Sequence, residues 1–253
     1  MTSSIQLLHW GAPKQIKTMI TNRHGGFSQA PFDSLNLGSH VGDDPVVVQK
    51  NRDALKSLLP NEPVWLNQIH GTQVVDADEH GSGVPNADAS VTTTPGQVLA
   101  IMTADCLPVL LASKDGKVIG AAHAGWRGLA AGVIEQTVTL MRAKQNNQTQ
   151  SEILAYLGPA IGPHAFEVGS EVRDIFMAQN PASAACFEPL QEKGKYLADI
   201  YALASLRLNA MGIDFIEGGG ECTLQNPDYF SYRRDQKTGR MGSFIWIDAV
   251  QNT

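Results

Sequence analysis

The sequence of 253 residues has few cysteines and no long apolar run. Its three cysteines, Cys106, Cys186 and Cys222, form an odd and sparse set, which excludes a disulfide framework and suits a reducing cytoplasm. No stretch reaches the roughly 18 apolar residues that a membrane-spanning helix needs. The N-terminal segment also lacks the apolar run of a signal peptide. We therefore expect a soluble, cytoplasmic protein without a membrane partner.

Charged residues are also scarce, at 17% of the chain, whereas hydrophobic residues make up 43%. This balance excludes a disordered chain and allows a large buried core. The net charge of −6 argues against nucleic acid as a partner, although it permits a local anion site. The sequence has neither a P-loop nor a GxGxxG motif after a strand, so no nucleotide cofactor is indicated.

The apolar pattern predicts a mixture of helices and strands. Helical spacing covers 45–59, 129–144, 170–179 and 198–212, and apolar strand runs cover 96–104, 108–113 and 152–158. Asp115 and Gly116 between two apolar runs predict a hairpin. The stretch 22–45 is rich in turn-forming residues, and 143–152 is a polar loop candidate. Because no repeat or linker is visible, we expect one α+β (α/β mixed) domain over residues 1–253, with a mixed β-sheet flanked by helices.

Three short stretches, "NQIHG", "TADCLP" and "AAHAGWRG", each place a reactive residue after an apolar strand run. These residues are His70, Cys106 and His123. One thiolate and two imidazoles suit a zinc ion with an open fourth position. Alternatively, Cys106 is a nucleophile with a histidine as its base. Each residue taken alone is more often structural, and their wide spacing matches no compact ligand motif.

Small residues surround His123 and point to a ligand that approaches the main chain. They are Gly120, Gly125 and Gly128. Arg127 stands at the start of the following helix, where free N–H groups also favour a phosphate or a carboxylate. A surface salt bridge is the alternative interpretation of Arg127.

A second group of basic residues lies near the C-terminus, in "YFSYRRDQKTGRMGSF" (229–244). It contains Arg233, Arg234, Lys237 and Arg240, a local basic patch suited to an anion in an acidic protein. Arg23 in "TNRHGG" is a further anion-binding candidate. A solvated loop and a simple turn are the respective alternatives.

Several long motifs in order resemble the YfiH-like family, also named the laccase-domain or multicopper polyphenol oxidase family. They are "NQIHG", "TADCLPVLL", "AAHAGWRG", "LGPAIGP" and "FSYRRDQKTGRMGSFIW", and the similarity runs from "TNRHGGFS" to the end of the chain. The resemblance implies a single α/β domain and a metal, usually zinc, held by His70, Cys106 and His123. It also implies phosphorolysis of adenosine, inosine and 5′-methylthioadenosine, deamination of adenosine, and a link to peptidoglycan editing by removal of L-serine from a muramyl precursor. An older label for the family is oxidation of phenols by copper.

The residue types in the chain favour some of these activities over others. A multicopper oxidase needs a blue-copper centre and a trinuclear cluster with many His-x-His pairs, but this chain has seven histidines and no such pair. Copper can still occupy a single site of two histidines and one cysteine. Zinc deaminases use a carboxylate that moves protons without binding the metal. Asp105 is expected to face away from a metal at Cys106 because strand residues alternate, and Asp88 is an equal candidate or a turn residue.

The resemblance therefore implies a zinc-dependent purine nucleoside phosphorylase with adenosine deaminase activity. We expect its partners to be purine nucleosides and phosphate, and we expect Arg127 or the basic loop 233–240 to bind the phosphate. The first alternative is a cysteine amidase or hydrolase in which Cys106 attacks and His123 is the base. A binding module without catalysis is disfavoured by the grouped cysteine and histidines.

Overall fold

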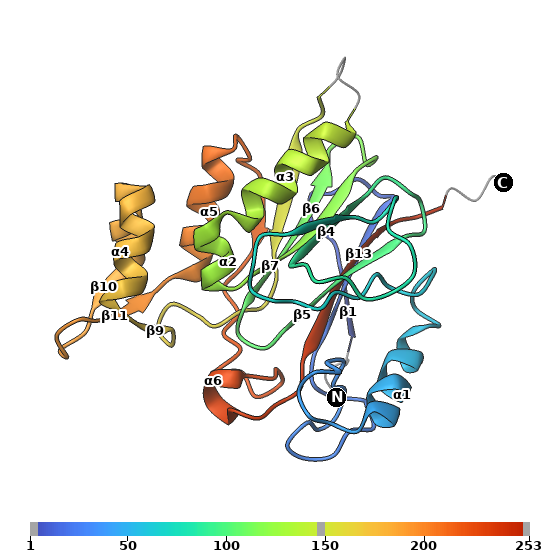
Figure 1. Ribbon diagram of the computed structural model, residues 1–253, viewed down its shortest axis with the longest axis horizontal. Coiled ribbons are helices and arrows are strands. Elements are labelled where there is room, and N and C mark those ends of the chain that lie inside the picture. Colours follow the sequence, from blue (N-terminus) through green and yellow to red (C-terminus); the bar gives the residue numbers. More distant parts are fainter. Residues whose placement is uncertain (1–4, 146–149, 250–253) are drawn as a thin grey trace.

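A computed structural model describes residues 5–145 and 150–249, and its centre is a pair of stacked β-sheets (Figure 1). The first sheet is antiparallel with the strand order β1-β2-β13-β5: Ile5–Leu8, Ile16–Thr21, Met241–Ile247 and Val98–Thr103. The second is mixed with the order β12-β8-β6-β7-β4-β3: Ile216–Gly218, Ile153–Leu157, Leu107–Ser113, Ile119–Ala124, Ala89–Thr92 and Val74–Asp76. The predicted α+β class is confirmed.

The central strands β5 and β6 are buried on both faces, and this explains their uninterrupted apolar runs. Successive strand residues point to opposite faces. In β6, Leu110 packs against the first sheet, whereas Val109 and Leu111 pack against helices. In β5, Leu99 packs between the sheets and Ala100 faces the far side. Each strand therefore has no polar face.

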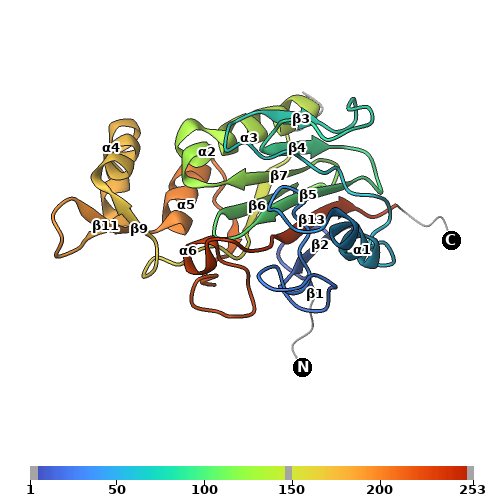
Figure 2. The same cartoon turned by 60° about the horizontal axis from the view of Figure 1, so that its bottom comes forward.

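Helices cover the outer faces of the two sheets (Figure 2). On the mixed sheet lie α2 (Trp126–Ala131), α3 (Val133–Lys144) and α5 (Ile200–Ala210), whose apolar faces join one core cluster with β6 and β7. On the antiparallel sheet lie α1 (Pro45–Leu55) and the preceding loop, which supply Leu35, Leu37 and Leu55 to another cluster. The four layers account for most of the buried side chains.

A smaller unit projects from the edge of the molecule (Figure 2). It is a three-stranded sheet of order β10-β11-β9 (Phe187–Pro189, Lys195–Ala198 and Glu167–Gly169) with α4 (Ser170–Gln179) and a 3-10 helix, Pro181–Cys186. The chain enters this unit after Phe166 and leaves it at Ile200, both of which are buried. A last short helix, α6 (Tyr232–Asp235), precedes β13.

Most predicted elements are confirmed, and the differences have local causes. The hairpin at Gly116 joins β6 and β7, and α4 has the predicted bounds. The helix predicted over 129–144 is two helices, because Gly132 adopts a φ of 102° and ends α2. The helices predicted over 45–59 and 198–212 end earlier, at Leu55 and Ala210. Four residues of the loop predicted over 143–152, 146–149, lie outside the described residues.

The stretch 229–244 is not a continuous loop, since it contains α6 and the start of β13. The turn-rich stretch predicted over 22–45 has no helix or strand up to Asp44, and its last residue, Pro45, begins α1. It is held by Asn51 of α1, whose Nδ2 donates to Ser28, Ser34 and Asn36. Among the described residues, no helix is long and apolar enough to cross a membrane.

Candidate functional site

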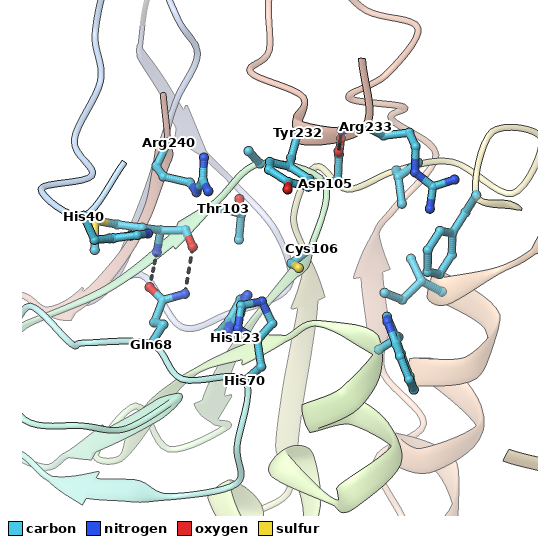
Figure 3. Close-up of a pocket in the computed structure, with 16 residues that line it drawn as sticks. His40, Gln68, His70, Thr103, Asp105, Cys106, His123, Tyr232, Arg233 and Arg240 are labelled. Atoms are coloured by element: carbon cyan, nitrogen blue, oxygen red, sulfur yellow. Dashed lines mark hydrogen bonds between the residues drawn. The ribbon is translucent and has the colours of Figure 1, made fainter. Parts of the chain in front are cut away.

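His70, Cys106 and His123 converge where the ends of several strands meet (Figure 3). Their ligand atoms, one from each residue, lie within 4.8 Å of one another, and the two imidazole rings meet edge to face with centroids 4.8 Å apart. Cys106 directly precedes β6, and His123 is the penultimate residue of β7. His70 lies in a loop instead of at a strand end, with a φ of 60°. The group spans an exposed, an intermediate and a buried residue.

The buried carboxylate of Asp88 holds two of the three residues in place. Its Oδ1 accepts hydrogen bonds from Nδ1 of His123 at 2.8 Å and from the N–H of His70 at 2.9 Å. Its Oδ2 accepts from the N–H groups of Ile69 and Gly71 at 3.1 and 2.7 Å. Burial alone would raise the pKa of Asp88, but these hydrogen bonds lower it. The bond to Nδ1 leaves Nε2 of His123 for the site.

Gly125 explains why the residues around His123 are small. A Cβ at this position would lie 3.0 Å from Sγ of Cys106 and 3.2 Å from the ring of His70, so any larger residue would fill the space between the three groups. Gly120 and Gly128 serve packing instead. The first lies under Met141 of α3, and the second under the carbonyl of Gly71.

Cys106 and His123 have opposite electrostatic shifts. Burial alone would raise the pKa of Cys106, but the charge of His123 and hydrogen bonds from both histidines lower it to about 6. Burial alone would lower the pKa of His123, but the thiolate of Cys106 and the carboxylate of Asp88 raise it to about 9. The thiolate form, which is both nucleophile and metal ligand, is therefore favoured at neutral pH.

Asp105 occupies the turn by which the chain passes from β5 in one sheet to β6 in the other. It has a φ of 83°, so the strand alternation invoked for it does not apply. Its Oδ1 accepts from the hydroxyl of Thr223 at 2.7 Å, and its Oδ2 accepts from the N–H of Arg233 at 2.7 Å. Asp105 lines the cavity, and its carboxylate ties the turn before Cys106 to α6.

The three residues lie in a cavity of about 280 Å³. Small-molecule sites have volumes of roughly 300–1,000 Å³, so this one suits a small ligand. Polar lining residues include His40, Gln68, Tyr232, Arg233 and Arg240, and apolar ones include Met102, Trp126, Ile161, Phe166 and Ile200. The cavity thus combines cations, a possible metal-binding group and apolar surface.

Only some of the basic residues proposed from the sequence line this cavity. Arg233 and Arg240 line it, whereas Arg127 is exposed and stacks on the ring of Trp126 at 4.4 Å. Arg23 also lies outside the lining and pairs with Asp33 and Asp235, at 3.4 and 3.9 Å.

Arg234 of the same basic stretch donates to the carbonyl groups of Thr223, Leu224 and Tyr229. Lys237 lies over the ring of Phe32, 5.4 Å from its centroid. Neither residue is part of the cavity lining.

Sequence reasoning missed His40, Gln68 and Tyr232. The Gln68 side chain accepts from the N–H of Met102 and donates to its carbonyl, both at 2.8 Å, and so fastens the loop before His70 to β5 (Figure 3). The signals for these residues were the turn-rich stretch around His40, the position of Gln68 inside "NQIHG" and the position of Tyr232 inside "FSYRRDQ".

Comparisons with known proteins cover almost the whole chain. Residues 17–248 match the family described as "Multi-copper polyphenol oxidoreductase laccase". A Pseudomonas aeruginosa protein named "Purine nucleoside phosphorylase PA4543" is 50% identical over 239 residues, which are 94% of this chain and 96% of that protein. "Purine nucleoside phosphorylase YfiH" of Escherichia coli is 50% identical over 248 residues, 97% of this chain and 99% of that one.

Two solved structures share the fold. The Neisseria meningitidis protein NMB0706 matches with a TM-score of 0.91 and 48% identity, over 98% of this chain and 100% of that one. YlmD from Geobacillus stearothermophilus matches with a TM-score of 0.87 and 32% identity, over 98% of each chain.

Proposed function

The chain belongs to the YfiH-like family, described as multi-copper polyphenol oxidoreductase laccases, and from this membership we propose that it is a zinc-dependent purine nucleoside phosphorylase. The proposed substrates are adenosine, inosine and 5′-methylthioadenosine, with inorganic phosphate, and deamination of adenosine is the proposed second activity. The observation that carries the proposal is the convergence of His70, Cys106 and His123 in a cavity that also holds two arginines and apolar surface. The names of relatives at 50% identity support the same activity.

The three donor groups fit a metal ion of borderline softness. A thiolate and two imidazoles suit zinc or copper, and three protein ligands leave a fourth position for water or substrate. The space that a Cβ at Gly125 would fill lies between them, and Asp88 orients His123 as carboxylates commonly orient metal-binding histidines. When bound, zinc would act as a Lewis acid and lower the pKa of a bound water to about 7.

Phosphorolysis breaks the bond between C1′ of the ribose and N9 of the purine, and forms a bond from C1′ to a phosphate oxygen. The electron pair of the broken bond goes to the purine, which takes up a proton, so the products are ribose 1-phosphate and the free base. The protein has to hold a phosphate dianion beside C1′ and exclude water. Arg233 and Arg240 bring positive charge to the cavity, and Ile161, Phe166 and Ile200 bring the dry surface.

Deamination replaces the 6-amino group of adenosine with an oxygen from water, and ammonia leaves. It needs a carboxylate that moves protons. Both oxygens of Asp88 and both of Asp105 already accept hydrogen bonds. Asp88 accepts a hydrogen bond from the ring of His123, whereas the carboxylate of Asp105 accepts from Thr223 and from the N–H of Arg233. Asp88 is therefore the better placed of the two for this role.

A cysteine amidase or hydrolase is the second candidate, and one observation favours it. Cys106, His123 and Asp88 form a series of thiol, imidazole and carboxylate, and the pKa of Cys106 is lowered to about 6. Sγ would attack an amide carbonyl and form a thioester while His123 gives a proton to the departing amine, and water would then hydrolyse the thioester to a carboxylic acid and restore the thiol. This activity needs no metal and would account for editing of a muramyl precursor.

Oxidation of phenols by several coppers receives no support from the site. The chain has seven histidines, and within residues 5–145 and 150–249 one His/Cys group is grouped closely enough to hold a metal. A single copper at this group does not make a blue-copper centre with a trinuclear cluster.

Metal content and turnover of Cys106→Ala beside the wild type separate the two candidates. We expect about one zinc per chain in untagged wild type by plasma mass spectrometry, and loss of both zinc and ribose 1-phosphate formation in the variant. Cys222→Ser is the matched control and should keep both, because Cys222 does not line the cavity. Ribose 1-phosphate formation that survives complete chelation would contradict the zinc mechanism. Hydrolysis of an amide substrate that survives chelation and is abolished by thiol alkylation would favour the hydrolase.

A further inference from the structure

The two arginines of the cavity lie on opposite sides of the proposed metal ligands (Figure 3). Arg240 lies on one side with His40 and Gln68, and Arg233 lies on the other. The reactants of phosphorolysis also differ in character: one is a small dianion, and the other carries a flat aromatic base. We therefore compared the two walls of the cavity, the one with Arg240 and the one with Arg233, as binding sites for phosphate and for the base.

Arg240 is a partly buried cation with hydrogen-bonding capacity to spare. Its Nη1 donates to the carbonyl groups of Thr238 and Gly239, both at 3.0 Å. Among the described residues it forms no ion pair, and its Nε and Nη2 have no acceptor. A guanidinium that has lost water without gaining an anion is costly, and a phosphate supplies the two acceptor oxygens that its planar fork matches.

The backbone of Arg240 is held rigidly. Its N–H donates to Oδ1 of Asn36 at 2.9 Å, and its carbonyl accepts from the N–H of Leu37 at 3.1 Å. These bonds join the start of β13 to the loop that carries His40. The same hydrogen-bonded pair of segments therefore positions the side chains of both Arg240 and His40.

His40 adds a donor to the same wall. Burial lowers its pKa, and the charges of Arg240 and Arg52 lower it further, so the ring is neutral at pH 7 and carries one N–H. Within the part of the chain that the structure describes, the ring has no hydrogen-bond partner in the protein. A neutral imidazole can donate to a phosphate oxygen beside the guanidinium.

The opposite wall suits the base. Phe166 lies 5.7 Å from the guanidinium of Arg233, and it belongs to one apolar cluster with Ile161 and Ile200. Both Nη atoms of Arg233 already donate to the carbonyl of Glu167, at 3.1 Å. Both Nη atoms of Arg233 are thus engaged with the protein and its guanidinium lies over an aromatic ring, whereas Arg240, within the described part of the chain, uses only Nη1 and keeps Nε and Nη2 for a ligand.

We propose that Arg240 and His40 form the phosphate subsite, and that the purine lies against Phe166, Ile161 and Ile200 on the other side of the His–Cys–His group. This assignment rests on the proposed phosphorolysis. It places the ribose, and the bond that breaks, next to His70, Cys106 and His123. The ligand of the Arg240 wall is a phosphate dianion, supplied as inorganic phosphate and released as ribose 1-phosphate.

The first experiment measures the KM for phosphate and for inosine in Arg240→Met and in Arg127→Met. Loss of a charge-assisted pair should raise the phosphate KM of Arg240→Met about 10- to 100-fold and leave the inosine KM within about twofold. Arg127→Met should match the wild type, because Arg127 is exposed and outside the cavity. A phosphate KM raised by Arg127→Met and unchanged by Arg240→Met overturns the assignment.

The second variant, Phe166→Leu, tests the other wall. It should raise the inosine KM about 3- to 10-fold and leave the phosphate KM unchanged, because it trims apolar contact alone. A change in the phosphate KM larger than that in the inosine KM reverses the proposed orientation. If Arg240→Met does not fold, His40→Gln carries the test, with a phosphate KM raised about 3- to 10-fold.

Direct binding keeps the subsite testable if phosphorolysis is not found. Calorimetric titration of wild type and Arg240→Met with inorganic phosphate, and separately with adenosine 5′-monophosphate, needs no turnover. Phosphate binding that Arg240→Met weakens at least about tenfold supports the subsite even in a protein without phosphorylase activity. Binding of the nucleotide through Arg240 without binding of inorganic phosphate overturns it, because the phosphate would then belong to a nucleotide.

Discussion

Asp78 and Asp88 lie at either end of the β3–β4 pair, and each collects hydrogen bonds from a neighbouring loop. Asp78 accepts hydrogen bonds from the hydroxyl groups of Thr92, Thr93 and Thr94 and from one backbone N–H. It also accepts from Nζ of Lys144 at 2.9 Å. Asp88 accepts from three backbone N–H groups and from the ring of His123. The pKa of each is held below its usual range, because these bonds outweigh the opposing effect of burial.

The difference lies in the cationic partner. Lys144 ends α3, pairs also with Asp76, and therefore joins the helix to the edge of the sheet. The partner of Asp88 is His123, whose second nitrogen faces Cys106 and His70. The same carboxylate chemistry thus stabilises the fold at one place, and at the other also fixes the orientation of a histidine that we propose as a metal ligand. Variants at the two positions should separate these roles.

The largest expected effect is that of Asp88→Asn on the site. An amide cannot accept from all four donors, so His123 and the loop at His70 lose their common anchor. We expect zinc affinity and kcat/KM to fall about 10- to 100-fold, measured by chelator competition and by initial rates. Asp78→Asn is the control and should leave zinc affinity unchanged. Equal losses of zinc affinity in both variants would abolish the distinction between the two aspartates.

Asp78→Ala should act on stability instead. It removes the acceptor of several hydrogen bonds and leaves Lys144 with Asp76 alone, so the free energy of unfolding should fall by about 2–4 kcal/mol in urea titrations. The folded variant should keep the kcat/KM of the wild type within about twofold. A loss of kcat/KM above tenfold at full folding would show that Asp78 also supports the site.

The smallest effect is a pH dependence that Asp78 contributes. Its pKa is lower in the folded protein than the usual 3.8, so its carboxylate stabilises the fold above that pH, and this contribution is lost as the pH falls below it. The difference in unfolding free energy between wild type and Asp78→Asn should therefore be largest at pH 6 and shrink towards pH 3. Urea titrations at both values measure it. A difference that is constant or grows on acidification contradicts the proposed origin of the stabilisation.

Local pattern was sufficient for several elements. The helix over 170–179 is confirmed because Val172 and Phe176 are its buried residues at helical spacing, and the Gly116 hairpin is confirmed because the turn needs a positive φ. The break at Gly132 was missed because both flanking helices continue the same apolar pattern. Strand β13 was missed because its pairing with β2 and β5 involves residues far away in the sequence.

The site shows the same division. His70, Cys106 and His123 were singled out by their local context and by resemblance, and the structure brings them together. The basic residues could not be sorted in the same way. Whether an arginine lines the cavity depends on how α6 and β13 lie against the loop at Asn36. The residues next to Arg127 and Arg240 in the sequence do not indicate this arrangement.

The sequence by itself determined the composition of the layers and the chemistry available to the site: apolar runs for strands buried on both faces, glycine beside the reactive residues, and a thiol with two imidazoles. Only the tertiary structure decided that Asp88 anchors two of those residues and that Arg240 and His40 share a wall. The reason is physical, because periodicity and turn preference act over a few residues, whereas these contacts are made by strands and loops that are brought together only when the two sheets stack.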